Sequence, residues 1–174
     1  FNFLALLIFH LKVAATVGKG IIDPGLVDHY VIFAALVGAI AWNVITWYFG
    51  IPSSSSHALI GGIVGAGLAS AGPAALAGSE ILYVIAFIVV SPMLGFFLGG
   101  LLMLIVSWMM VGVKPLKVDK WFRRLQLVSA GLYSLGHGGN DAQKTIGIIW
   151  LLLIAANVPG AREEEPSWVV ISCY

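Results

Sequence analysis

The sequence predicts an all-α polytopic membrane protein, built as a bundle of transmembrane helices. Apolar residues make up 60% of the chain and charged residues only 10%, whereas a soluble domain carries about 45–50% apolar and about 25% charged residues. The mean hydropathy is +1.00, and several apolar runs are long enough to cross about 30 Å of hydrocarbon. Both ends of the chain lie inside apolar runs, so we expect a segment of a longer protein.

Charge and cysteine content exclude several other classes of protein. The net charge of +1 is too small to attract nucleic acid. The single cysteine, Cys173, permits neither a disulfide framework nor a cysteine zinc site. We therefore expect a protein of the lipid bilayer that has no nucleic-acid partner and no cofactor.

The first two apolar segments span about residues 1–17 and 30–48. His10 and Lys12 interrupt the first segment, and we interpret them as interface or packing residues rather than ligands. The second segment is long enough to cross the bilayer. Aromatic residues such as Trp47 lie near its end, as is typical of the membrane interface.

The third and fourth apolar segments span about residues 51–72 and 81–113. The third is rich in glycine, which lets neighbouring backbones approach closely. The fourth is too long for one straight crossing. Pro92 and Gly95 favour a kink, so we expect this segment either to tilt or to break into two pieces.

A basic cluster separates these segments from the rest of the chain. Residues 114–124 hold five lysine or arginine residues and one aspartate, so the positive-inside rule places this loop in the cytoplasm. The fifth apolar segment spans about 125–158 and is interrupted by polar residues at 136–145. Three glutamates at 163–165 follow, and a single net crossing puts them outside. Residues 167–174 begin a sixth segment.

The polar residues at 136–145 are the first candidate site. Asp141 and Lys144 lie between two apolar runs, where each charge costs roughly 2.5–3.5 kcal/mol on insertion scales, so each needs a partner or a wet cavity. Three glycines precede them and disfavour helix, and Asn140 or Asp141 can cap a helix that resumes. The pattern predicts a discontinuous helix whose buried N-terminus binds an anion. Asp141 then needs a cation, Na⁺ or H⁺.

Two other interpretations of the same residues stay open. Asp141 and Lys144 can pair across one helix turn as a purely structural tie. Alternatively, residues 138–145 nearly fit the nucleotide-binding motif G-x-x-x-x-G-K-[ST], although Gln143 stands where that motif requires glycine. The apolar flanks and the absence of a preceding strand pattern argue against a nucleotide site.

The second candidate site lies at residues 52–57. Proline is tolerated only in the first turn of a helix, and the four serines that follow Pro52 are good N-caps. This pattern predicts a second helix N-terminus, surrounded by hydroxyls that can bind phosphate oxygens or a cation. The alternatives are an ordinary polar loop and, for His57, a turn residue without a ligand.

Two stretches of the chain resemble the inorganic phosphate transporter (PiT) family in its bacterial form. Gly138-Gly139-Asn140-Asp141-Ala142-Gln143-Lys144 is similar to the N-D motif of that family's second repeat. Gly50-Ile51-Pro52-Ser53-Ser54-Ser55-Ser56-His57-Ala58-Leu59-Ile60-Gly61 is similar to the serine motif of its first repeat. The resemblance covers essentially the whole chain, while the first N-D motif and the second serine motif are expected outside it.

The resemblance implies two inverted repeats, each with a re-entrant or discontinuous helix. Residues 1–113 then end the first repeat, with a serine-motif hairpin near 50–72, and 125–174 begin the second, after the cytoplasmic loop 114–124. Phosphate is expected at Ser54, Ser55, Ser56, Asn140 and Gln143. The coupling cation is expected at Asp141, with Ser54 and Asn140, and accessory roles are expected for His57 and Lys144.

The function implied is phosphate transport across the inner membrane by a multi-pass protein, coupled to Na⁺ or H⁺, with a metal–phosphate complex as another substrate form. Sulfate is the nearest rival substrate, and a homodimer is one expected assembly. An intramembrane enzyme, with Ser55 or Ser56 as nucleophile and His57 as base, is a weaker hypothesis because adjacent residues at a helix start point in different directions. A purely structural subunit leaves the N-D motif unexplained.

Overall fold

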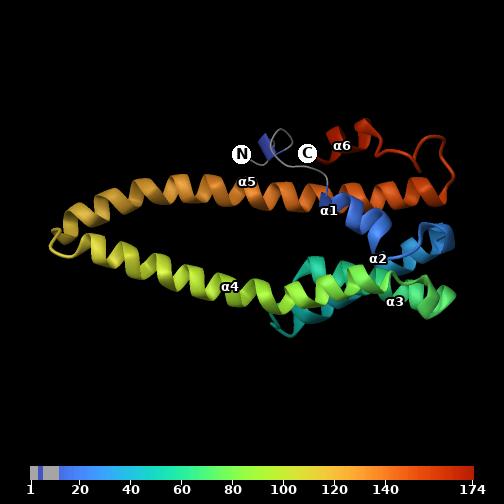
Figure 1. Ribbon diagram of the computed structural model, residues 1–174, viewed down its shortest axis with the longest axis horizontal. Coiled ribbons are helices and arrows are strands. Elements are labelled where there is room, and N and C mark those ends of the chain that lie inside the picture. Colours follow the sequence, from blue (N-terminus) through green and yellow to red (C-terminus); the bar gives the residue numbers. More distant parts are fainter. Residues whose placement is uncertain (1–3, 6–11) are drawn as a thin grey trace.

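A computed structural model describes residues 4–5 and 12–174 of the chain (Figure 1). Two of the helices in this described part, α2 and α4, are long and apolar enough to cross a membrane. The elements in order are α1 (Lys12–Ala15), the π-helix η2 (Thr16–Gly20), the 3₁₀ turn η3 (Pro24–Leu26), α2 (His29–Tyr48), α3 (Ser55–Ala71), the 3₁₀ turn η4 (Pro73–Ala75), α4 (Gly78–Met110), α5 (Pro115–Ala155) and α6 (Ser167–Cys173).

Helices α4 and α5 form two long arms that meet at the turn between them (Figure 1). At the other end of the molecule, α2 and α3 pack against each other beside the start of α4, and α6 lies along the C-terminal part of α5. The chain passes from α2 to α3 through a short loop at residues 49–54. A Cβ atom placed on Gly62 of α3 would overlap the carbonyl oxygen of Ala35 in α2, so the two backbones are in direct contact.

The second predicted segment is confirmed, and the third differs from the prediction. Helix α2 begins after Asp28, whose carboxylate accepts a hydrogen bond of 2.8 Å from the Val31 amide. The hairpin expected within residues 50–72 is not seen there, because this stretch is a loop followed by the 17-residue unbroken helix α3. The chain instead reverses before α3, where Gly50 adopts the positive φ of 66° that glycine allows.

Helix α4 runs unbroken over 33 residues and keeps Pro92 in its interior. Of the two expectations for this segment, a break is therefore excluded. At 1.5 Å per residue the helix is about 50 Å long, well beyond the hydrocarbon core. None of its residues is buried within the described part of the chain, so nearly all of this apolar surface is open to lipid or to other helices.

Helix α5 corrects two predictions. Residues 114–124 do not form a loop, because α5 begins at Pro115, a residue suited to the first helical position. An ion pair of 2.9 Å between Asp119 and Arg123 supports this first part of the helix. The helix then continues through residues 136–145 without the predicted break, and so it has no internal N-terminus there.

The core lies where the segment before α2 crosses α5. A Cβ atom on Gly147 would come within 2.7 Å of the Val17 Cβ, so glycine permits this close crossing. Val17, Ile21 and Ile22 also pack against α2 and α3, which places this segment between α5 and the α2–α3 pair. Of the polar residues predicted in the first segment, His10 lies outside the described residues.

Candidate functional site

The serine stretch forms a helix N-terminus, as predicted. Ser54 has an extended backbone (φ −100°, ψ 120°), and its hydroxyl accepts a hydrogen bond of 3.4 Å from the His57 amide. This is the geometry of an N-cap. The neighbouring Ser53 shares a hydrogen bond of 3.2 Å with Thr46 at the end of α2, which ties the loop to the preceding helix.

The N-D stretch forms a charged cluster on one face of α5. The two oxygens of the Asp141 carboxylate lie 2.6 Å from the Lys144 ammonium and 3.0 Å from His137 Nε2. The His137 ring in turn stacks on Tyr133, with ring centroids 5.8 Å apart. The structural tie between Asp141 and Lys144, one of the sequence-based alternatives, is therefore present.

A cavity of about 690 Å³ brings the two motifs together. It lies between η2, α3, α4 and α5, and both motifs contribute to its wall. Ser56 and His57 line it from the first turn of α3, while Asn140 and Lys144 line it from the middle of α5. Polar residues more than 80 positions apart in sequence thus line one cavity, whose wall is otherwise largely apolar.

Three polar residues of α4 in this wall were missed by the sequence reasoning. They are Glu80, Tyr83 and Ser91. Glu80 is half-buried and lies in the first turn of its helix, where the helix dipole favours a carboxylate. The sequence does hold one sign of a special role, because Glu80 is the only acidic residue between Asp28 and Asp119. Its distance in sequence from both motifs, however, gives no indication that it lies near them.

Other predicted site residues lie away from this cavity. Gln143 is buried, and its side-chain oxygen accepts a hydrogen bond of 3.0 Å from the Val13 amide. This bond satisfies a free donor at the start of α1. Asp141 lines a separate recess of about 270 Å³ beside Tyr174. Ser55 is exposed and is not among the residues that line the 690 Å³ cavity.

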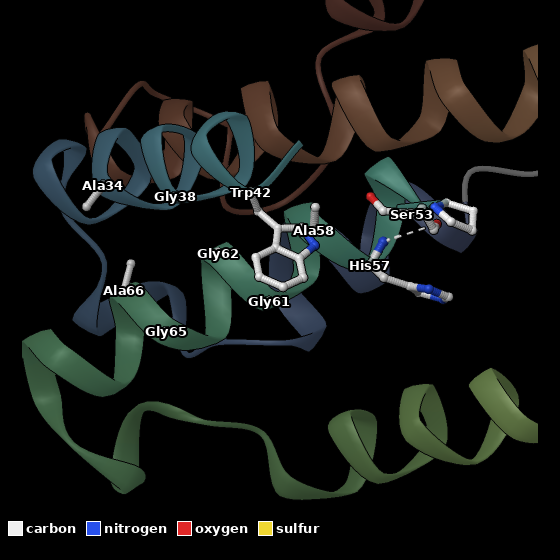
Figure 2. A pocket seen from close by; sticks show the side chains of 12 residues that line it. Ala34, Gly38, Trp42, Ser53, His57, Ala58, Gly61, Gly62, Gly65 and Ala66 are labelled. Atoms are coloured by element: carbon white, nitrogen blue, oxygen red, sulfur yellow. Dashed lines mark hydrogen bonds between the residues drawn. The ribbon is translucent and has the colours of Figure 1, made fainter. Parts of the chain in front are cut away.

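A second large cavity, of about 710 Å³, lies on another side of the α2–α3 pair (Figure 2). Its wall consists mainly of small residues of both helices, together with Trp42, Ser53 and Ser54. His57 lines this cavity and the 690 Å³ cavity as well. The first turn of α3 therefore separates the two cavities.

The helical membrane fold, and a cavity between its helices that carries polar side chains from distant segments, are features of a transport protein. The chain belongs to the phosphate transporter family, whose family model matches residues 1–174. This family and the relatives named below are transporters and not enzymes, so the alternative of an intramembrane enzyme is excluded.

Bacterial relatives match the chain over nearly its whole length. A probable low-affinity inorganic phosphate transporter of Rhizobium meliloti is 60% identical over 173 residues, which cover 99% of this chain and 52% of that protein. The Bacillus subtilis protein of the same description is 47% identical over 174 residues, with the same coverage of both chains. The low-affinity inorganic phosphate transporter PitA of Escherichia coli is 34% identical over 92% of this chain and 38% of its own length.

A solved structure shares the fold. It is described as the sodium-dependent phosphate transporter, and it matches with a TM-score of 0.74 at 20% identity, over 99% of this chain and 61% of that one. The chain spans about half the length of the curated relatives named above.

Proposed function

We propose that the full-length protein transports inorganic phosphate across the membrane and couples this transport to the movement of Na⁺ or H⁺. The observation that carries the proposal is the 690 Å³ cavity, in which the serine motif and the N-D motif meet. A membrane protein keeps polar and charged side chains in its interior only where they serve a partner or a pathway. Family membership supports phosphate as the substrate.

The cavity offers the hydrogen-bond donors that a phosphate ion needs. Ser56 supplies a hydroxyl, Asn140 an amide NH₂ group and Lys144 an ammonium group. The first turn of α3 adds the positive end of a helix dipole. We assign phosphate binding to this set, with His57 as an accessory residue. Ser54, Ser55 and Gln143, which the sequence also predicted as phosphate contacts, do not line this cavity, and we leave them out of the proposed set.

The coupling cation offsets the negative charge of phosphate. Asp141 remains a proposed cation ligand, with Ser54 and Asn140, but its carboxylate is shared between Lys144 and His137. Glu80 provides a carboxylate in the wall of the cavity itself. We therefore include Glu80 with Asp141 as a candidate site for the coupling ion.

The arrangement in the membrane is also part of the proposal. Residues 1–113 close one repeat and 125–174 open a second, inverted repeat, in a multi-pass protein of the inner membrane. The basic segment 114–124, which is helical in the structure, then lies on the cytoplasmic side. Two copies of the full-length protein form a dimer.

Transport is tested with the full-length protein in proteoliposomes. We expect uptake of radiolabelled phosphate, driven by an inward Na⁺ or H⁺ gradient and inhibited little by excess sulfate. Asn140→Ala removes a cavity donor and should reduce phosphate uptake at least tenfold, because a hydrogen bond to a charged group contributes about 1.5–3 kcal/mol. Asn43→Ala, in the C-terminal half of α2, is the matched control and should transport normally. Absence of uptake by the wild-type protein would exclude the proposed function.

The coupling ion is tested in the same vesicles. Glu80→Gln and Asp141→Asn are compared by the Na⁺ and pH dependence of uptake, with Glu165→Gln in the loop before α6 as the control. The residue that holds the ion should alter the cation concentration needed for half-maximal uptake. An unchanged cation dependence in both variants would remove both carboxylates from the coupling site.

A further inference from the structure

A third cavity, of about 380 Å³, lies at the opposite end of the molecule, where α4 turns into α5. Its wall is formed by the last turns of α4 and the first turns of α5, and its lining is apolar except for one lysine. The lining residues are Val106, Met109, Met110, Val113, Lys117, Val118, Trp121, Phe122 and Leu125. The cavity contains no residue of either transport motif, so transport does not explain it.

Basic residues are concentrated in the segment that forms one wall of this apolar cavity. The segment from Lys114 to Arg124 holds five basic residues and a single acid, Asp119. Asp119 forms an ion pair of 2.9 Å with Arg123. It therefore does not neutralise the other four basic residues of the segment. One of them, Lys117, is part of the cavity wall.

The residues around the cavity are of the kinds that gather at a membrane surface. It spans the end of the apolar helix α4, from Val106 to Met110, and the start of the basic segment. Trp108 and Trp121, on the two helices, are 83% and 64% exposed. Exposed tryptophans beside basic residues at the end of a membrane span are typical of the lipid headgroup region.

We propose that this cavity, which we call the turn cavity, binds one anionic phospholipid. The headgroup phosphate lies against Lys117 and its basic neighbours, and an acyl chain lies against Met109, Trp121 and Phe122. Charge complementarity favours an anionic lipid over a zwitterionic one, because basic clusters next to a membrane span attract anionic headgroups. The apolar wall favours a lipid over an acidic peptide, which would leave that wall without a partner.

The proposal is tested by tryptophan quenching in the full-length protein, which is independent of transport. The probes are phosphatidylglycerol and phosphatidylcholine with identical brominated acyl chains, because bromine quenches only tryptophans that it approaches closely. We expect brominated phosphatidylglycerol to quench more strongly at the same mole fraction. Trp121→Phe should abolish this excess, whereas Trp42→Phe, in the 710 Å³ cavity, should keep it.

Charge variants identify the headgroup contact. Lys117→Gln should raise the phosphatidylglycerol concentration needed for half-maximal excess quenching about fivefold, since a basic residue near an anionic surface contributes about that factor. Arg162→Gln, a cation in the loop before α6, should leave it unchanged. Equal quenching by the two lipids, or an excess that survives Trp121→Phe, would overturn the proposal.

Discussion

The serine stretch at residues 52–57 and the N-D stretch at 136–145 interrupt apolar segments in the same way, yet their backbones differ. At the serine stretch the chain leaves one helix and starts another, with Ser54 as the cap. At the N-D stretch the α5 helix continues without a break. Both stretches nevertheless contribute side chains to one cavity.

The difference shows which residues end a helix in an apolar environment. A proline in a helix interior costs about 3 kcal/mol or more, so Pro52 favours the end of a helix. The serines that follow it can accept hydrogen bonds from the free amides of the next helix. The glycines before Asn140 each cost only about 1 kcal/mol relative to alanine. Breaking α5 there would expose several backbone groups, each at a cost of several kcal/mol where water is absent. The helix therefore continues, and only its side chains serve the cavity.

Proline substitution gives the largest expected contrast between the two stretches. Ala142→Pro lies inside α5 and should destabilise the protein by about 3 kcal/mol or more, because it removes a helical hydrogen bond. Ser55→Pro occupies the first position of α3 and should change stability by less than about 1 kcal/mol. The thermal unfolding midpoint of the purified full-length protein measures both. A mild effect of Ala142→Pro would show that α5 is broken there after all.

Adjacent serines should differ in their effect on transport. Ser56 lines the cavity and Ser55 does not. Ser56→Ala should raise the KM for phosphate about 10-fold or more, since a hydrogen bond to a charged group contributes about 1.5–3 kcal/mol, whereas Ser55→Ala should be close to wild type. Initial uptake rates over a range of phosphate concentrations decide this. The opposite order would place Ser55 at the substrate.

Gln143 and Asn140 should separate stability from binding on the same helix. Gln143→Ala removes the part-buried bond to the Val13 amide and should lower stability by about 1–3 kcal/mol, with little change in the KM for phosphate. Asn140→Ala should do the reverse. Unfolding curves and uptake kinetics of both variants provide the comparison, and a raised KM in folded Gln143→Ala would return this residue to the binding site.

The cap of α3 should give the smallest effect. Ser54→Ala removes the acceptor for the His57 amide and should destabilise the protein by about 0.5–1 kcal/mol, because the bond of 3.4 Å is long for a cap worth about 0.5–2 kcal/mol. Ser54→Asp keeps an acceptor and should retain wild-type stability. A loss in Ser54→Asp equal to that in Ser54→Ala would mean that capping is not the role of this side chain.

Local chemistry made part of this molecule predictable from sequence. Composition predicts the membrane fold, and Pro52 with its serines predicts the start of α3. Other features depend on contacts between distant segments. Gln143 bonds Val13 from 130 positions away, and Glu80 reaches the cavity only because α4 packs beside it. The continuity of α5 depends on whether glycine in a helix costs more than unpaired backbone groups do. The order of glycine, asparagine and aspartate in the sequence does not reveal which cost is larger.

The backbone contact between Gly62 and Ala35 has a mechanical consequence. Two helices whose backbones touch at one point cannot move closer there, so we expect α2 and α3 to move together as one rigid unit in any conformational change. The fixed end of this unit is held by two backbone hydrogen bonds. The Asp23 amide donates to the Ala75 carbonyl, and the Ala77 amide donates to the Ile21 carbonyl. The arm along α3 is about 25 Å long, so a rotation of about 5° moves the serine tip by about 2 Å, roughly the difference between a made and a broken hydrogen bond.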